Sequence, residues 1–186
     1  AWHSGLHADG LPPVTAAAAV AVRFAVGYVL GQRADIKWVN DVLVDGKKVC
    51  GILAECSERS DGADIVIGIG INLTPPEGGF PPELGGAGAL CSHMEPEVAE
   101  ELAASVIAEL CALLDGGGAD EIMSRYREGC CSIGGKLRLR RDGGAVEYTV
   151  LDIGDDGELI VESPDGERLT VISAAEVCRP AERGNY

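Results

Sequence analysis

Three strand-like runs follow one another between residues 35 and 73, and this succession constrains the fold more than any other feature. The first two runs, DIKWVNDVLV and KKVCGILAE, flank Asp45-Gly46, a dipeptide that accepts the positive φ angles of a tight hairpin turn. A polar turn, SERSDGAD, precedes the third run, DIVIGIGINL. Strands joined by short turns pair antiparallel, so we expect a meander with one face packed on a helix.

Helical segments lie on both sides of these strands in the sequence. The segment LPPVTAAAAVAVRFAVGYVLG is apolar almost all round, with Thr15 as the expected cap and Gly31 at the C-terminal end. After a loop rich in Pro and Gly at 74–88, apolar residues recur at helical spacing between Pro96 and Gly116. The segment ADEIMSRYREGC then predicts a shorter helix.

The character of the sequence changes at Cys130, where short alternating strands separated by Asp-Gly and Gly-Gly turns begin. This pattern is typical of a small β-barrel. We therefore predict an α+β fold. Residues 1–131 form a mixed or antiparallel sheet packed on helices, residues 132–180 form a small appended barrel, and residues 181–186 form a tail.

Composition excludes several classes of function. The formal net charge is -15 and no long run of Lys and Arg occurs, which disfavours a nucleic-acid partner. The apolar segment 16–30 contains Arg23 and is shorter than the roughly 20 apolar residues of a bilayer span, so no membrane partner is expected. The seven cysteines include no CxxC pair, which indicates reduced thiols in a cytoplasmic protein and no zinc site.

Several residues stand where a ligand could bind, although each also has an ordinary structural explanation. Lys37, beside apolar strands, either extends to solvent or is held for an anionic ligand. Gly51 interrupts a strand, which marks a bulge or a close approach of a ligand or backbone. Asn72 can read a purine edge or form a turn, and Asn40-Asp41 suits a turn or a strand end.

The order of three motifs resembles the biotin protein ligase family, whose signature is KWPND, then a hairpin with GKK followed by GILxE, then a G-(I/V)-GIN strand. Here these stand as KWVND at Lys37–Asp41, GKKVCGILAE at Gly46–Glu55 and IGIGINL at Ile67–Leu73. The later segment DDGELIVESPDG looks like the SH3-like C-terminal module of the family. The resemblance implies a core like that of class II aminoacyl-tRNA synthetases, followed by an SH3-like barrel.

The chemistry that the resemblance implies is acyl-adenylation. Biotin and MgATP would give biotinyl-5'-AMP, and a lysine of a biotin carboxyl carrier domain, such as that of acetyl-CoA carboxylase, would then accept the biotin. Two anions, the biotin carboxylate and the α-phosphate, must come together, and a fixed cation lowers their repulsion. Lys37 matches the catalytic lysine of the family.

By the same resemblance, the other matched positions receive roles in binding. Gly51, Ile52 and Leu53 would line the biotin pocket, and Lys37 would contact biotin as well. Asn72 and Asn40 would bind the nucleotide, and Asp41 would hold Mg²⁺. Family members often pair through their central sheets, so a homodimer is also implied.

Two departures from the family pattern and two alternatives accompany this interpretation. Val39 replaces the motif proline, and the family's GRGRRGR segment is not in this sequence. We therefore expect an N-terminally truncated chain that, by itself, binds biotin and ATP weakly or not at all. The alternatives are a lipoate-type protein ligase, which shares the fold and the adenylation chemistry, and a non-catalytic remnant that only docks a carrier domain.

Overall fold

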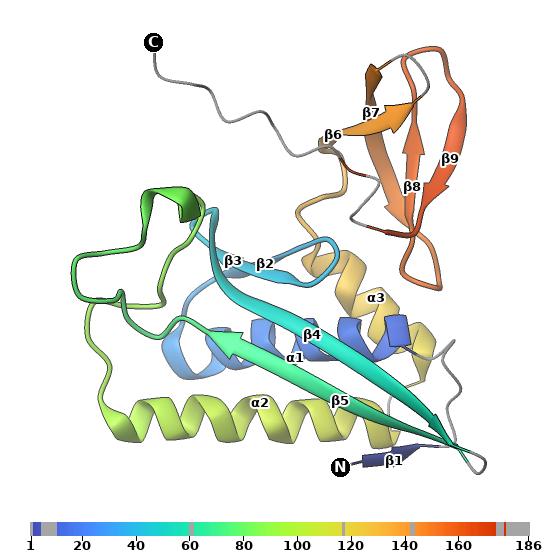
Figure 1. Ribbon diagram of the computed structural model, residues 1–186. Helices are drawn as coiled ribbons and strands as arrows, with labels where there is room; N and C mark the ends of the chain where they lie inside the picture. The colour runs from blue at the N-terminus through green and yellow to red at the C-terminus, as the bar shows by residue number, and fades with distance from the viewer. Residues whose placement is uncertain are drawn as a thin grey trace. The chain divides into compact units, whose positions relative to one another are not determined.

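The computed structural model describes residues 2–4, 11–59, 62–116, 118–141, 144–173 and 177, and Figure 1 shows its ribbon. The chain divides into two compact units, residues 1–131 and residues 132–186. Within the described residues, no helix is long and apolar enough to cross a membrane.

The first unit is built on a five-stranded antiparallel sheet, which confirms the predicted meander. Its strands lie in the order β1-β5-β4-β3-β2, and the longest pairing joins β4 to β5, from Cys50 opposite Ile71 to Arg59 opposite Gly62. The strand bounds are β1 (Trp2–Ser4), β2 (Ala34–Lys37), β3 (Asp41–Val44), β4 (Lys47–Arg59) and β5 (Gly62–Ile71).

The described residues of this unit include three α-helices, α1 (Leu11–Leu30), α2 (Pro96–Gly116) and α3 (Ala119–Gly129). Helix α1 packs on the sheet, α2 packs on α1, and α3 contacts α1 and β2. Helix α1 contacts strands β2 to β5 as well as both other helices, so it is packed between layers as its all-round apolar sequence predicts (Figure 1). Its alanines and valines at positions 17–22, 25 and 26 are buried and form the centre of the core.

The two ends of α1 differ in how well the sequence predicts them. Gly31 has a φ of 63° and its N–H donates to the Gly27 carbonyl at 3.0 Å, which confirms the predicted C-terminal glycine. The predicted N-terminal cap is wrong, because the helix begins at Leu11 and Thr15 lies inside it. The two prolines therefore occupy the first turn, where their missing N–H groups cost nothing.

The predicted strand over residues 35–44 is also wrong in one respect, because it is two strands. Strands β2 and β3 form a hairpin whose turn spans residues 38–40, and Lys37 pairs directly with Asp41. The peptide bond between Trp38 and Val39 is cis. The chain turns here because the Asn40 side chain donates to the Ile52 carbonyl on β4 at 2.6 Å, which fastens the turn to the next strand.

The hairpin between β3 and β4 has the predicted turn and an additional bulge. Asp45 and Gly46 adopt φ angles of 51° and 73°, as a tight hairpin turn requires. The register then shifts, because Val42 pairs with Cys50 whereas Leu43 pairs with Lys48. Val49 is thus the extra residue of a β-bulge, and Val49 and Cys50 are both buried despite being consecutive.

The second unit contains a four-stranded antiparallel sheet in chain order, with bounds β6 (Lys136–Arg141), β7 (Gly144–Ile153), β8 (Leu159–Glu162) and β9 (Arg168–Val171). Gly157 and Gly166 have φ angles of 83° and 84°, as expected for the glycines of the Asp-Gly turns. Its core contains Leu139, Tyr148, Val150, Ile153, Leu159, Val161 and Val171. Closure of this sheet into an SH3-like barrel stays a prediction.

Candidate functional site

A row of four residues crosses the first sheet from β2 to β5. Lys37 pairs with Asp41, Asp41 pairs with Gly51, and Gly51 pairs with Gly70. Residues directly opposite each other in antiparallel strands point to the same face of the sheet. The row therefore places a lysine and an aspartate beside two positions that have no side chain.

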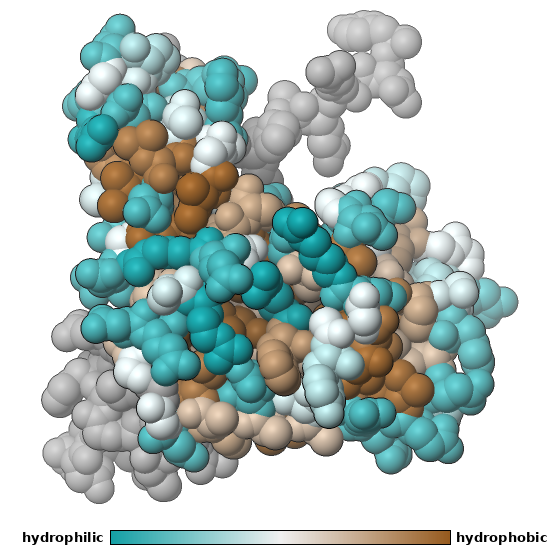
Figure 2. Space-filling view, turned by 180° about the vertical axis from the view of Figure 1, so that it is seen from behind, coloured by the Kyte–Doolittle hydropathy of each residue, from teal (hydrophilic) through white to brown (hydrophobic). Residues whose placement is uncertain are grey.

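The face that carries this row is the face turned away from α1. Along β4 and β5, Leu53 and Val66 are 61% and 63% exposed, whereas Ile52 and Ile65, which point the other way, are buried. Apolar residues also reach the surface elsewhere, as the brown patches among the teal in Figure 2 show. Exposed apolar surface alone therefore does not locate a site. The charged residues Lys37 and Asp41 distinguish the row from the other apolar patches.

Lys37 is exposed at the end of β2, and the backbone around it is held by a set of hydrogen bonds. On one side, Asn40 donates to the Ile52 carbonyl and the Ile52 N–H donates back to the Asn40 carbonyl at 3.0 Å. On the other side, the Cys131 N–H donates to the Ile36 carbonyl at 2.8 Å. The lysine thus extends from a segment that hydrogen bonds fix on both sides, and its predicted role toward an anion stays a prediction.

A tyrosine from α3 completes this set of bonds. The Tyr126 hydroxyl donates to the Val39 carbonyl at 2.8 Å, and the ring is buried. Burial, together with the neighbouring Cys130, Cys131 and Asp41, raises the pKa of Tyr126 well above its usual value, so the hydroxyl keeps its proton. No local pattern predicts this contact, because Tyr126 and Val39 are 87 residues apart in the chain.

A second lysine lies on the same face as Lys37. The Lys48 ammonium forms an ion pair with the Asp41 carboxylate. A Cβ atom built on Gly51 would lie 3.2 Å from both Cε and Nζ of Lys48, so this side chain covers the glycine. Sequence reasoning missed Lys48, although the KK that precedes GILAE was visible.

The three residues predicted to line a biotin pocket do not all reach this face. Gly51 and Leu53 lie on it, but the Ile52 side chain is only 2% exposed and points into the core. The backbone N–H and carbonyl of Ile52 are both engaged by Asn40. The structure therefore places Gly51 in the row of Lys37 and Leu53 on the same face two residues along β4, and it leaves the Ile52 side chain on the other side of the sheet.

Asn72 lies just after β5 and fastens a loop to the sheet. Its backbone N–H donates to the Val49 carbonyl at 2.7 Å, and its side-chain amide donates to the Gly88 carbonyl at 2.9 Å. The Leu90 N–H in turn donates to the Asn72 carbonyl. The residue predicted to bind a nucleotide thus stands close to the bulge at Val49 and anchors residues 86–90 beside it.

The described residues give little support for a metal held by the protein alone. They contain no group of three or more His, Cys, Asp or Glu side chains that could hold an ion. The carboxylate of Asp41, the predicted Mg²⁺ ligand, is paired with Lys48. Burial raises the pKa of the neighbouring Cys50 thiol to about 12, so this sulfur carries its proton at neutral pH.

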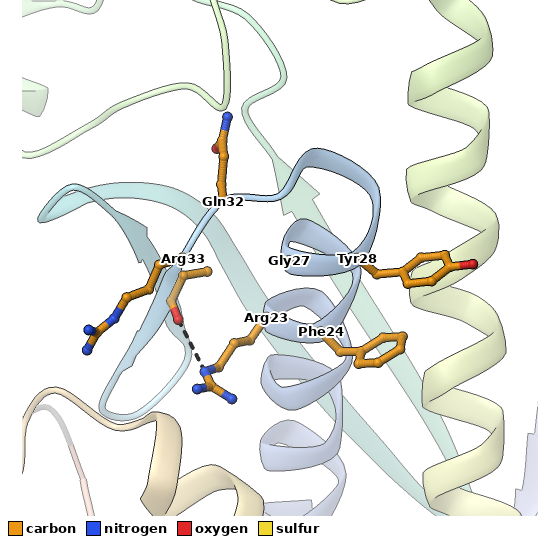
Figure 3. Close-up of a pocket in the computed structure, with 7 residues that line it drawn as sticks. Arg23, Phe24, Gly27, Tyr28, Gln32 and Arg33 are labelled. Atoms are coloured by element: carbon orange, nitrogen blue, oxygen red, sulfur yellow. Dashed lines mark hydrogen bonds between the residues drawn. The ribbon is translucent and has the colours of Figure 1, made fainter.

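A cavity of about 380 Å³ lies elsewhere, at the C-terminal end of α1 (Figure 3). Its side chains do not converge. Phe24 and Tyr28 stack on each other with ring centroids 5.8 Å apart and point away from Arg23 and Gln32 in Figure 3. Its lining residues are Arg23, Phe24, Gly27, Tyr28, Gln32, Arg33 and Ala34.

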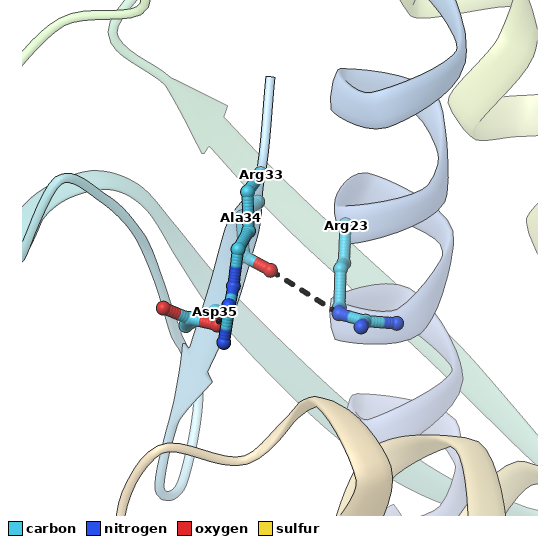
Figure 4. A network of polar contacts seen from close by, with 4 residues as sticks. All are labelled: Arg23, Arg33, Ala34 and Asp35. Carbon is cyan, nitrogen blue, oxygen red and sulfur yellow. Dashed lines mark hydrogen bonds and ion pairs between the residues drawn. The ribbon is translucent and has the colours of Figure 1, made fainter. Parts of the chain in front are cut away.

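Both arginines of this cavity contact other residues of the chain. Arg23 donates from Nε to the Ala34 carbonyl at 3.2 Å, which ties α1 to β2, and Arg33 pairs with Asp35 at 3.3 Å (Figure 4). The path of Arg23 requires Gly129, because a Cβ there would lie 2.7 Å from Arg23 Cδ. Gln32 donates from its amide nitrogen to the Leu90 carbonyl at 3.0 Å, and its buried Oε1 has no hydrogen-bond partner among the described residues. Arg23, Arg33 and Gln32 therefore contact separate parts of the chain and do not surround a common ligand position.

The chain is similar in sequence to known biotin ligases and matches a family of biotin and lipoate protein ligases. The profile of the Biotin/lipoate A/B protein ligase family matches residues 14–72. The biotin--[acetyl-CoA-carboxylase] ligase of Paracoccus denitrificans is 36% identical over 170 residues, which cover 86% of this chain and 70% of that protein. The bifunctional ligase/repressor BirA of Bacillus subtilis is 32% identical over 163 residues, which cover 83% of this chain and 50% of BirA.

A solved structure supports the fold independently of the motifs. The biotin protein ligase of Aquifex aeolicus in complex with biotin and ATP superposes with a TM-score of 0.67 at 21% identity, over 90% of this chain and 71% of that one. At this level of identity the likeness concerns the fold. The chain spans about half the length of its Bacillus relatives.

Proposed function

Because the chain belongs to the biotin protein ligase family, we propose that it carries the adenylation site of a ligase that attaches biotin to a carrier protein. The observation that carries the proposal is the row of Lys37, Asp41, Gly51 and Gly70 on the sheet face turned away from α1. A fixed cation there stands beside two residues without side chains, one of which, Gly51, lies under the end of the Lys48 side chain, and two anionic substrates need such a cation in order to meet.

The proposed reaction has two steps, adenylation of biotin and transfer of biotin to the carrier. A carboxylate oxygen of biotin attacks the α-phosphorus of ATP, a new P–O bond forms, and pyrophosphate leaves with the electrons of the broken bond. The amine of a carrier lysine then attacks the carbonyl carbon of biotinyl-5'-AMP, an amide forms, AMP leaves, and the amine releases a proton. Lys37 would stabilise the negative charge that accumulates around the α-phosphate in the first step.

The remaining residues divide into those that contact substrate and those that hold the site. Gly51 allows the ligand to approach the β4 backbone, and Leu53, which is exposed on the same face, offers apolar contact for the rings of biotin. Asn40 keeps the turn behind Lys37 in place through β4. Asn72 would meet the nucleotide from the end of β5, beside the loop that it anchors.

Magnesium enters this scheme as part of the substrate. The described residues do not fit a preformed Mg²⁺ site, because Asp41 is paired with Lys48 and no acidic cluster accompanies it. Magnesium commonly keeps several waters and binds through substrate phosphates. It would therefore arrive bound to ATP.

The proposal is tested by the release of pyrophosphate from ATP in the presence of biotin. Residues 1–186 and the product of the whole open reading frame are both assayed, with lipoate in parallel because the family profile covers lipoate ligases too. We expect the whole product to release pyrophosphate with biotin and not with lipoate, and then to biotinylate a biotin carboxyl carrier domain. Release with lipoate alone would move the assignment to the lipoate branch, and no release with either acid would contradict an adenylation site.

A further inference from the structure

On the sheet face that carries the row of Lys37, Asp41, Gly51 and Gly70, the end of the Lys48 side chain fills the space above Gly51. A Cβ on Gly51 would lie 3.2 Å from Lys48 Nζ, so any ligand that approaches the glycine backbone meets the ammonium group. Gly51 is also directly opposite Asp41, whose carboxylate pairs with the same ammonium. Two separate observations thus place Lys48 where the ligand would lie.

The bulge in β4 explains how Lys48 reaches this position. Without an extra residue, strict alternation would put Lys48 and Gly51 on opposite faces, because they are three residues apart. The bulge at Val49 shifts the alternation by one, sends Val49 and Cys50 together into the core, and leaves Lys48 on the exposed side. The backbone of Lys48 is fixed as well, since its N–H donates to the Gly86 carbonyl and its carbonyl accepts from Gly88 at 2.8 Å each.

We propose that Lys48, held by Asp41, is a second substrate-binding cation that acts with Lys37 on the reacting anions. This inference rests on the proposed function and names a further contact at the same site. Lys37 and Gly51 are two strands apart, a span of roughly 10 Å, so the two lysine side chains can reach one anionic group from opposite sides. Asp41 stands between them and positions Lys48, which is a different role from that of a magnesium ligand.

The net charge of the chain gives a physical reason for a second cation at this site. The chain has a formal net charge of -15, so its overall field repels both ATP and biotin. A single lysine offsets little of the charge that a carboxylate and a triphosphate bring together. Lys48 is 46% exposed in its side chain and its partner Asp41 is 22% exposed, so the ammonium can bind an incoming phosphate without leaving the carboxylate.

The test compares two neighbouring lysines that carry the same charge. Lys48→Met keeps the length of the side chain and removes its charge, and Lys47→Met is the matched control, because the Lys47 stem packs beside Gly88 instead. The whole protein is assayed for pyrophosphate release at varied ATP and biotin, and pyrophosphate binding is measured by calorimetry. We expect Lys48→Met to lower kcat/KM for ATP by roughly 10-fold to 100-fold and to weaken pyrophosphate binding, with Lys47→Met within about 2-fold of the unaltered protein.

Two further variants separate charge from structure. Lys48→Arg should recover part of the lost kcat/KM, which a purely structural role in the strand would not explain. Asp41→Asn should lower kcat/KM for ATP while leaving the Mg²⁺ concentration that gives half-maximal rate unchanged. A shift of that concentration would instead make Asp41 a metal ligand and would overturn its assigned role toward Lys48.

The outcomes distinguish this inference from the proposed function. If Lys48→Met matches Lys47→Met in both rate and pyrophosphate binding, Lys48 is not a substrate-binding cation. If the unaltered protein releases no pyrophosphate with biotin, the proposed function fails. In that case the calorimetric comparison of the two variants still decides whether Lys48 binds anions.

Discussion

Replacement of Tyr126 by Phe removes one oxygen from a buried contact that joins α3 to the turn behind Lys37. The Tyr126 hydroxyl donates to the Val39 carbonyl at 2.8 Å, and Tyr126 is only 2% exposed. The variant leaves the carbonyl without this donor, and an unsatisfied buried polar group costs about 1–3 kcal/mol. For a chain of this length, each kcal/mol lowers the melting temperature by roughly 2–4 °C.

The assay is urea unfolding followed by fluorescence or circular dichroism, together with pyrophosphate release. Tyr28→Phe is the matched control, because Tyr28 is 71% exposed and should change the free energy of unfolding by less than about 0.5 kcal/mol. We expect Tyr126→Phe to lower kcat more than it raises KM for biotin, since it loosens the turn that carries Lys37. Equal free energies of unfolding for the two variants would refute the reasoning.

Two further predictions concern packing and pH. Gly129→Ala should destabilise the protein by about 1–3 kcal/mol, because the new Cβ would lie 2.7 Å from Arg23 Cδ. Gly116→Ala is the control and should not destabilise the protein, because the space around Gly116 is open. Equal melting temperatures of the two variants would contradict the assigned crowding at Gly129. Burial raises the pKa of Cys50 from its usual 9.0 to about 12, so its contribution to stability is fully present below pH 9 and is lost as the pH rises toward 12. Unfolding free energies measured between pH 8 and 10.5 should therefore fall less steeply with pH in Cys50→Ala, by up to about 1.4 kcal/mol per pH unit, and identical slopes would oppose this assignment.

Local signals in the sequence predicted the elements whose geometry depends on a few adjacent residues. The turn at Asp45-Gly46 and the helix end at Gly31 follow from positive φ angles that these residues tolerate, and the structure has them there. Helix α2 begins at Pro96 and ends at Gly116, as its apolar spacing predicts. These features need no knowledge of what lies elsewhere in the chain.

Features that depend on distant contacts could not be predicted in the same way. The segment 35–44 has the composition of a strand, and it breaks at residues 38–40 because Asn40 bonds to β4 and Tyr126 bonds to Val39. Prolines before an apolar run suggest a cap at Thr15, but they fit equally well inside the first turn, which is where the helix places them.

The candidate site shows the same division. The motifs identified Lys37, Gly51 and Asp41, and the register of the sheet brings these three into one row. The position of Lys48 depends on the bulge at Val49, which the sequence KKVCG does not predict. The ion pair between Lys48 and Asp41 could therefore be found only in the structure. The burial of the Ile52 side chain likewise follows from which face of β4 meets α1.

The most direct test of the central claim is the rate of biotin-dependent pyrophosphate release by Lys37→Ala, measured beside Lys47→Ala in the whole protein. Both variants lose one exposed lysine of the same sheet, and only Lys37 lies in the row with Asp41 and Gly51. The account predicts a rate lower by roughly 100-fold to 1,000-fold for Lys37→Ala, with little change for Lys47→Ala and similar melting temperatures for both. Equal rates in the two variants would contradict the placement of the adenylation site at Lys37.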